Sequence, residues 1–215
     1  MFAARKDRKL VAHHDFLDAV DRIIGGLEKR TKVITENEKN TIAFHEAGHA
    51  VVSWLVEFAS PLVKVSIVPR GQSLGAAWYL PEERAITTTE QIFDEMCAAL
   101  GGRAAEEIMF GKISTGALSD LEKVTKQAYS MVSIYGLNAR IGNRSYYDSR
   151  GESSFTKPYS EETARIIDEE VSAVIEKAYA RALDILATNR EKLEALAQSL
   201  LDNEVIFKED VERIL

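Results

Sequence analysis

The chain has few cysteines and no surplus of positively charged residues, and each of these shortages argues against a class of protein or partner. It has one cysteine, Cys97, so an intramolecular disulfide is excluded and a reducing compartment is indicated. It has no surplus of positive charge, because 27 lysines and arginines stand against 34 aspartates and glutamates, for a net charge of −7. This balance argues against a nucleic-acid partner, whose phosphates need basic residues to neutralise them.

Long apolar runs are also missing. No stretch approaches the roughly 20 apolar residues that span a bilayer, and the basic start MFAARKDRKL lacks the apolar segment of a signal peptide. The 215 residues, 46% hydrophobic and 28% charged, are typical of a globular protein with one large domain or one domain and an appendage. We therefore expect the chain as given to be soluble, which leaves open what a longer parent protein contains.

Histidine is scarce as well, with four residues, yet two of them stand in the stretch TIAFHEAGHAVVSW. His45 and His49 would lie on one face of a helix and direct their rings at one point. Glu46 would lie about 100° around the helix from His45. This is the H-E-x-x-H pattern, in which two histidines bind zinc and the glutamate is the general base. The alternative is a pair of hydrogen-bonded core histidines and a solvated glutamate, but the joint spacing of three residues favours the metal.

Hydrophobic periodicity predicts a mainly helical domain with a small β-sheet beside the motif helix. Thr35 and Glu38 form a capping box, which predicts a motif helix over about 36–58. The runs 62–68 and 75–80 predict two strands. Two further helices are expected over 15–24 and from 88 to a C-cap at Gly111, and a third follows the turn 114–116. A long helix is expected from 160 to 188, another after Asn189 as its N-cap, and a short one over the last ten residues. Residues 138–159 are expected to form a mobile loop.

Catalytic zinc takes three protein ligands and leaves one position for water, so the motif needs a third ligand. No further histidine follows at a suitable interval, and His13 and His14 stand at the edge of the first expected helix, where they are poor candidates. The remaining candidates are the carboxylates Glu106, Glu107 and Asp120. Spacing alone does not choose among these three.

Several further motifs accompany HEAGHA in order, namely KVSIVPRG, LGAAWYLPEE, GGRAAEE and STGALSDLEKVT. Together they closely resemble the peptidase domain of FtsH-type membrane-anchored AAA+ metalloproteases, including the mitochondrial m-AAA and i-AAA relatives, from about residue 10 to the C-terminus. The resemblance implies Zn²⁺ as cofactor. It implies that His45, His49 and Asp120, the aspartate of the T-G-A-x-x-D-L segment, are the ligands, with Glu46 as the catalytic base. The carboxylates of GGRAAEE would then support the site or the fold.

The resemblance also implies a domain organisation. Residues 1–33 resemble the end of an AAA+ lid and its linker, and residues 34–215 resemble the zinc metallopeptidase domain. The segment FGKIST is no P-loop, because Ile113 follows Lys112 where serine or threonine is required. ATP would therefore bind only in a full-length parent, and the ATPase core and N-terminal membrane anchor of the family are expected outside this chain. The parent is expected to be a hexamer in the bacterial inner membrane with this domain on the cytoplasmic face, or in the mitochondrial inner membrane.

The activity implied is zinc-dependent endopeptidase cleavage of unfolded or threaded polypeptides. An extended substrate can pair with an exposed strand, and Gly75, Ala76, Ala77 and Trp78 are the candidate edge, with small side chains that let a backbone approach. The alternative is an ordinary hairpin arm packed on the motif helix. The stretch IYGLNARIGNRSYYDSRG departs from the G-M-S-E-K-L-G of the family, which affects a loop but no catalytic residue.

Two other functions compete with this one. An assembly module with a structural zinc would need four protein ligands, and the single cysteine lies far from the motif. A self-contained small-peptide protease of another H-E-x-x-H family would carry no remnant of an ATPase. The lid-like N-terminus of this chain argues against that function. Three ligands and an open position beside Glu46 would indicate catalysis.

Overall fold

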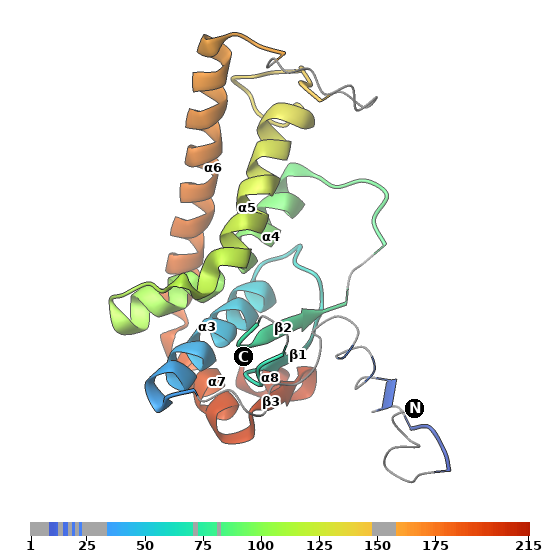
Figure 1. Ribbon diagram of the computed structural model, residues 1–215, viewed down its shortest axis with the longest axis vertical. Coiled ribbons are helices and arrows are strands. Elements are labelled where there is room, and N and C mark those ends of the chain that lie inside the picture. Colours follow the sequence, from blue (N-terminus) through green and yellow to red (C-terminus); the bar gives the residue numbers. More distant parts are fainter. Residues whose placement is uncertain are drawn as a thin grey trace.

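The computed structural model describes residues 9–12, 15–16, 19, 22, 34–70, 73–80, 83–147 and 158–215 (Figure 1). His13, His14, most of the first expected helix and the centre of the expected mobile loop lie outside the described residues. Within the described residues the chain forms six α-helices and one small sheet, so the mainly helical architecture predicted from the sequence is confirmed.

The elements follow in the order α3 (Glu36–Leu55), β1 (Leu62–Ser66), β2 (Ala76–Tyr79), α4 (Thr89–Phe110), the 3-10 turn η1 (Thr115–Ala117), α5 (Leu118–Tyr129), the π-helical turn η2 (Ser130–Ile134), α6 (Glu161–Thr188), α7 (Arg190–Asn203), β3 (Val205–Phe207) and α8 (Lys208–Ile214). In Figure 1, α3 lies between the sheet and the helices α4 and α7, while α5 and α6 extend away from the sheet. No helix in the described part of the chain is both long and apolar enough to cross a membrane.

The sheet has three antiparallel strands in the order β2-β1-β3, so among the described strands β2 stands at an edge. In the central strand, Val65 lies opposite Ala77 of β2 and Ile206 of β3. Strands β1 and β2 are confirmed, but β3 corrects the expectation of a helix over all of the last ten residues. The end of the chain returns to β1 and buries Ile206, a contact between distant segments that local periodicity does not reveal.

Helix α3, which carries the H-E-x-x-H motif, begins where the sequence predicts. The Thr35 side chain accepts a hydrogen bond from the Glu38 backbone, and the Glu38 carboxylate accepts one from the Thr35 backbone, which confirms the capping box. The helix ends at Leu55, earlier than the expected position near residue 58. Tertiary contact sets this end, because the backbone N–H of Phe58 donates to the buried carboxylate of Asp94 on α4, 3.0 Å away.

Helices α3 and α4 cross with their backbones in contact. A Cβ on Gly48 would lie 2.3 Å from the carbonyl oxygen of Gly101, and a Cβ on Gly101 would lie 2.6 Å from that of Gly48. Any side chain at either position would force the helices apart. The glycines of HEAGH and GGRAAEE therefore set the distance between the helix that carries the histidines and the helix behind it.

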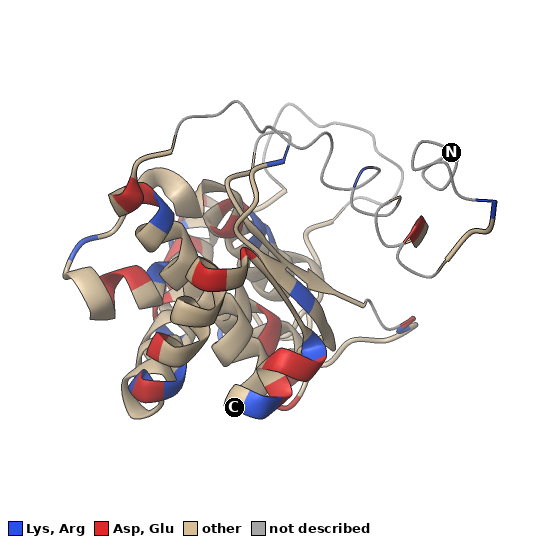
Figure 2. Ribbon diagram, turned by 90° about the horizontal axis from the view of Figure 1, so that it is seen from below, with Lys and Arg blue, Asp and Glu red and all other residues tan. Residues whose placement is uncertain are grey.

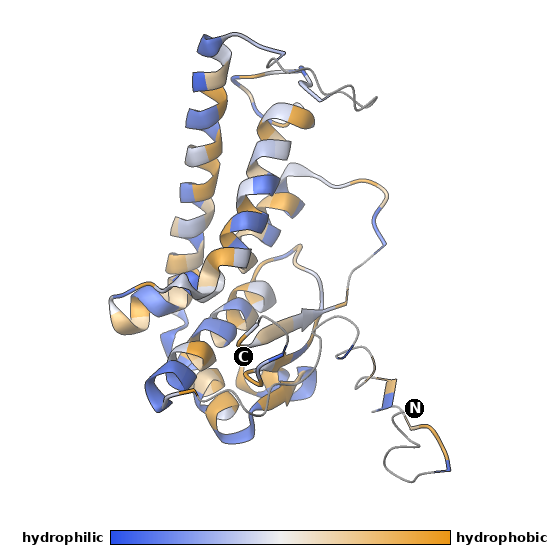
Figure 3. Ribbon diagram, in the orientation of Figure 1, coloured by the Kyte–Doolittle hydropathy of each residue, from blue (hydrophilic) through white to orange (hydrophobic). Residues whose placement is uncertain are grey.

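Helix α6 covers α4 and α5 and completes the core. Ile167, Val171 and Ala178 are buried as expected from the sequence, and Val174 and Ile185 are half-buried against the same core. Figure 3 shows apolar positions along the side of α6 that faces α5, and in Figure 2 acidic and basic residues are interspersed along the helices.

The ends of two helices were also predicted from single residues. Gly111 adopts the left-handed conformation (φ 61°) at the C-cap of α4, as expected. Asn189 is the N-cap residue of α7, as expected, but its side chain makes no capping hydrogen bond to α7 and instead donates to the carbonyl of Ile185 at the end of α6. Residues 138–147 form an irregular segment with one turn, within the region expected to be a loop.

Candidate metal centre

Three side chains from two distant segments meet at one point. His45 and His49, one turn apart on α3, have their Nε2 atoms 3.1 Å apart. Asp120, in the first turn of α5, places Oδ2 3.4 Å from Nε2 of His45 and 3.5 Å from Nε2 of His49. Both histidines are buried. The structure thus brings together the three residues for which the resemblance implies a zinc-binding role.

The second nitrogen of each ring is held by a hydrogen bond. Nδ1 of His45 lies 2.7 Å from Oε1 of Glu106, and Nδ1 of His49 lies 2.9 Å from the carbonyl oxygen of Ala98. A carboxylate and a carbonyl can only accept, so both Nδ1 atoms carry the proton and donate it. In a neutral imidazole Nε2 is then an acceptor. With both rings neutral, two imidazole lone pairs and the carboxylate of Asp120 face one another, and this arrangement favours a cation between them.

The spacing of the three atoms fits zinc. Zinc–nitrogen bonds of about 2.0–2.1 Å place neighbouring ligand atoms of a tetrahedral site about 3.3–3.4 Å apart, and the three atoms here are separated by 3.1, 3.4 and 3.5 Å. Histidines that donate their other nitrogen to a carboxylate or carbonyl are typical zinc ligands. Among the described residues this group has three members, as in catalytic sites that keep a fourth position for water.

The electrostatics of the cluster also favour a bound cation. Burial lowers the pKa of His45, but hydrogen bonds to Asp120 and Glu106 outweigh it and raise that pKa to about 10. Burial would raise the pKa of Asp120, yet its hydrogen bonds to His45 and His49 hold this pKa well below the usual value. Similarly, hydrogen bonds from His45 and Ser114 overcome burial and lower the pKa of Glu106. Two ionised carboxylates thus stabilise positive charge on or between the imidazoles.

Glu106 links the histidine helix to the segment that carries Asp120. Its buried side chain on α4 accepts from Nδ1 of His45 through Oε1. It also accepts from the Ser114 backbone N–H at 2.6 Å and from the Ser114 hydroxyl at 3.0 Å. The Ser114 hydroxyl oxygen in turn accepts from the backbone N–H of Gly116 and so caps the start of the turn η1. One carboxylate therefore fixes the tautomer of His45 and the turn before α5.

Gly102 forms the floor of the cluster. A Cβ at this position would lie 2.5 Å from Nε2 of His45 and 2.6 Å from Nε2 of His49. The backbone of α4 can support both rings at this distance only if residue 102 has no side chain. Sequence analysis did not identify this role, although the GG pair inside a helix was a signal, because glycine is costly there.

We expect Gly102→Ala to lower zinc affinity by about tenfold or more. Mutating a residue that orients a metal ligand typically lowers affinity by a similar factor. The added Cβ would displace both Nε2 atoms, while alanine favours the helix more than glycine. Zinc affinity can be measured by competition with a chromophoric chelator, and helix content by circular dichroism. Arg103→Ala, one position further along α4, is the control that should bind zinc normally. Wild-type affinity in Gly102→Ala would contradict the packing described here.

Glu46 lies beside the cluster, at the entrance to β2. Its carboxylate is buried, and a Cβ on Gly75 would lie 2.7 Å from its Oε1, so only glycine lets the chain pass this closely. The backbone of Ala77 forms a hydrogen bond to the carboxylate. Burial raises the pKa of Glu46 above its ordinary value, against the opposing effect of His49 and His45. The carboxylate of Glu46 lies outside the group His45, His49 and Asp120, and its raised pKa suits it to proton transfer.

A cleft of about 1250 Å³ lies over the cluster, lined by parts of α3, α4, η1, α5 and the segment 73–79. Of the four residues predicted to bind substrate, Gly75, Ala76 and Ala77 line this cleft. Trp78 does not line it, and the Lys64 ammonium instead lies 5.3 Å from the centre of its ring. The substrate role of these four residues stays a prediction.

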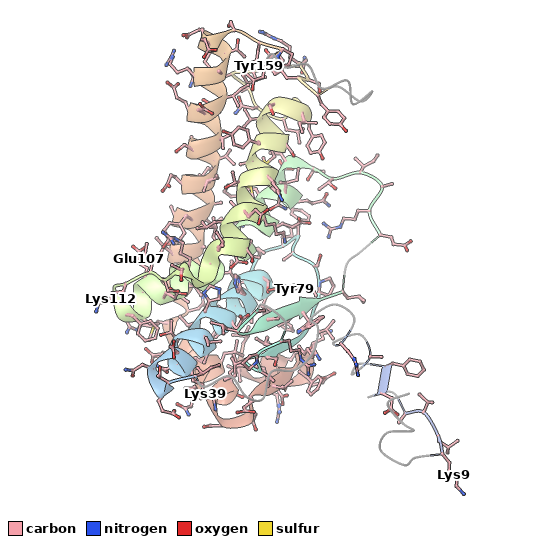
Figure 4. The ribbon with its side chains drawn as sticks, viewed as in Figure 1. Lys9, Lys39, Tyr79, Glu107, Lys112 and Tyr159 are labelled. Carbon is pink, nitrogen blue, oxygen red and sulfur yellow. The ribbon has the colours of Figure 1, made fainter. Side chains whose placement is uncertain are left out.

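The carboxylates that spacing alone left open occupy different places. Glu107 is exposed and accepts a hydrogen bond from the hydroxyl of Tyr179. Figure 4 places it near Lys112, where α4 ends, and away from Tyr79 on β2. Of the three candidates, Asp120 is the one whose carboxylate reaches both Nε2 atoms.

Comparison with known proteins gives a consistent result. The model of peptidase family M41 matches residues 32–214. The chain is 63% identical over its full length to the ATP-dependent zinc metalloprotease FtsH of Parabacteroides distasonis, of which it covers 31%. It is 52% identical to FtsH of Karelsulcia muelleri, covering 35% of that protein. It is also 48% identical to the mitochondrial inner membrane m-AAA protease component AFG3L1 of Mus musculus, covering 27%. The chain thus spans about a third of the length of these relatives. The chain belongs to peptidase family M41.

Proposed function

We propose that this chain is a zinc-dependent endopeptidase domain that cleaves extended polypeptides. The observation that carries the proposal is the set of three electron-pair donors, Nε2 of His45, Nε2 of His49 and Oδ2 of Asp120, that face one point with both Nδ1 protons directed away from it. Zinc would be held by these three residues. Bound there, it would lower the pKa of a coordinated water to about 7 and polarise a carbonyl.

The residues of the chain supply the remaining steps. Glu46 takes a proton from the attacking water and delivers it to the nitrogen of the leaving amine, which its raised pKa favours. Glu106 keeps the proton of His45 on Nδ1, so that Nε2 remains available as a ligand. The buried walls around Glu46 exclude bulk water and strengthen these interactions.

An extended substrate would pair with the edge of β2 that no other described strand occupies. The segment Gly75–Ala77 lines the cleft and touches Glu46, so a peptide beside it would pass directly over the proposed base. Main-chain hydrogen bonds to a strand do not depend on the side chains of the peptide, so they can bind substrates of many sequences. This suits an enzyme that acts on unfolded chains. Trp78 would contribute through its backbone, since its ring packs with Lys64.

The structural alternative is a zinc that only stabilises the fold. A closed structural site needs a fourth protein ligand, and the described residues place three in the cluster. The glutamate beside the cluster and the cleft above it favour catalysis.

The wider protein is also part of the proposal. We place the boundary of the peptidase domain at residue 34, with 1–33 as the end of an AAA+ lid and linker, which the start of the family match at residue 32 supports. The names of the relatives support an ATP-dependent parent protease. We further propose that the parent protein assembles as a hexamer and resides in a bacterial inner membrane with this domain on the cytoplasmic face, or alternatively in a mitochondrial inner membrane, as the bacterial and mitochondrial relatives support.

The direct test is hydrolysis of an unstructured, fluorescence-quenched peptide by the zinc-loaded chain. We expect cleavage that an excess of a strong chelator abolishes and that added zinc restores. Total metal is measured in the same samples, with about one zinc per chain expected. Active protein without zinc would overturn the proposed function, and so would a zinc-loaded chain that cleaves no peptide.

A further inference from the structure

Leu118 is an apolar side chain that lies open in the cleft of the candidate metal centre. It is the first residue of α5 and lines the same cleft as His45, His49 and Asp120. It is 72% exposed. Asp120, two residues later, turns toward the histidines, so Leu118 stands within one helical turn of the cluster.

The exposure of Leu118 is not explained by packing of the helix. The neighbouring Ala117 is buried, as are Val124 and Ala128 further along α5, and Leu121 packs against the core. These residues form the apolar face that joins α5 to the domain. Leu118 lies outside this face and contributes little to the core, so its apolar surface is available for another contact.

The rest of the cleft offers a complementary apolar surface. Ile42 of α3 and Leu74, just before β2, also line it, and Ala76 and Ala77 are small enough to leave room. A peptide beside β2 would run between this strand and the start of α5, with its successive side chains pointing to opposite sides. Side chains on one of these sides would meet Leu118.

We propose that Leu118 is a specificity-determining residue that contacts an apolar side chain of the substrate next to the peptide bond to be cleaved. The inference rests on the proposed endopeptidase function and adds a preference to it. The occupant is a substrate side chain rather than a second copy of this chain, because Leu118 lies inside the cleft beside the proposed zinc ligands. Burial against Leu118 would select leucine or phenylalanine over alanine or aspartate at that position.

The test compares peptides that differ at one position beside the scissile bond, carrying leucine, phenylalanine, alanine or aspartate. For wild type, kcat/KM should be higher for the leucine peptide than for the alanine peptide. In Leu118→Ser this selectivity ratio should fall by about tenfold, within the range that a few methylene groups in an apolar pocket supply. The zinc content should be that of wild type. Ile113→Ser is the matched control, because Ile113 is half exposed on the preceding loop and does not line the cleft.

Each outcome separates the two proposals. Wild-type selectivity in Leu118→Ser would overturn the role of Leu118 and leave the peptidase function standing. An altered oligomeric state by light scattering, with the selectivity ratio unchanged, would assign Leu118 to a contact between copies. If zinc-loaded wild type cleaves no peptide, the proposed function fails. The binding affinities for the leucine and alanine peptides would then still test Leu118. Its role is supported if wild type binds the leucine peptide more tightly and Leu118→Ser binds both peptides equally, and it is overturned if wild type shows no such preference.

Discussion

Replacing Glu46 by glutamine is expected to stop hydrolysis while leaving zinc in place. Glutamine has the size of glutamate and can still accept the hydrogen bond from Ala77, but it cannot take a proton from water. A general base contributes about 10²–10⁴-fold, so kcat should fall by roughly that factor. The measurement is turnover of the quenched peptide, with zinc determined in the same sample.

The contrast with a ligand variant makes this prediction specific. His45→Ala should lose zinc and activity together, because it removes one of the three donors. Glu46→Gln should lose activity alone. If Glu46→Gln cleaves the peptide at the wild-type rate, another group is the base. If it loses zinc, Glu46 belongs to the metal site itself.

Replacing Asp120 by asparagine should weaken zinc binding by about 100-fold or more, beyond the ~10–100-fold typical of residues that support a ligand. The amide lacks the negative charge that Asp120 directs at both Nε2 atoms. Zinc affinity is measured by chelator competition, and thermal unfolding of the metal-free protein checks that the fold persists.

Two glutamates provide matched controls for this experiment. Glu107→Gln should bind zinc like wild type, because its side chain is exposed and bonded to Tyr179. Glu106→Gln should show an intermediate loss, because it orients His45 and Ser114 without reaching Nε2. Normal affinity in Asp120→Asn together with a severe loss in either glutamate variant would contradict the ligand assignment.

Much of this site follows from local sequence patterns. The interval between His45 and His49 places both rings on one helical face whatever surrounds the helix. The capping box of Thr35 and Glu38 is likewise a local interaction, and it sets the start of α3. Helical periodicity and strand alternation predicted the mainly helical fold with its small sheet.

Contacts between distant segments could not be predicted in this way. Spacing did not distinguish Asp120 from Glu106 and Glu107, because the choice depends on how α4 packs on α3 and how α5 packs on α4. The role of Gly102 depends on how closely α4 approaches the rings of His45 and His49, and a glycine pair inside a helix does not indicate which side chains it will contact. Strand β3 was missed for the same reason, since it forms by pairing with β1.

The central claim is that His45, His49 and Asp120 hold one zinc at an open site beside Glu46. A crystal structure of the zinc-loaded chain, with anomalous diffraction recorded on both sides of the zinc absorption edge, tests it most directly. We expect one anomalous peak within about 2.0–2.2 Å of Nε2 of both histidines and of an Asp120 oxygen, with the fourth position held by water. A peak elsewhere, or a fourth protein ligand that closes the site, would contradict the claim.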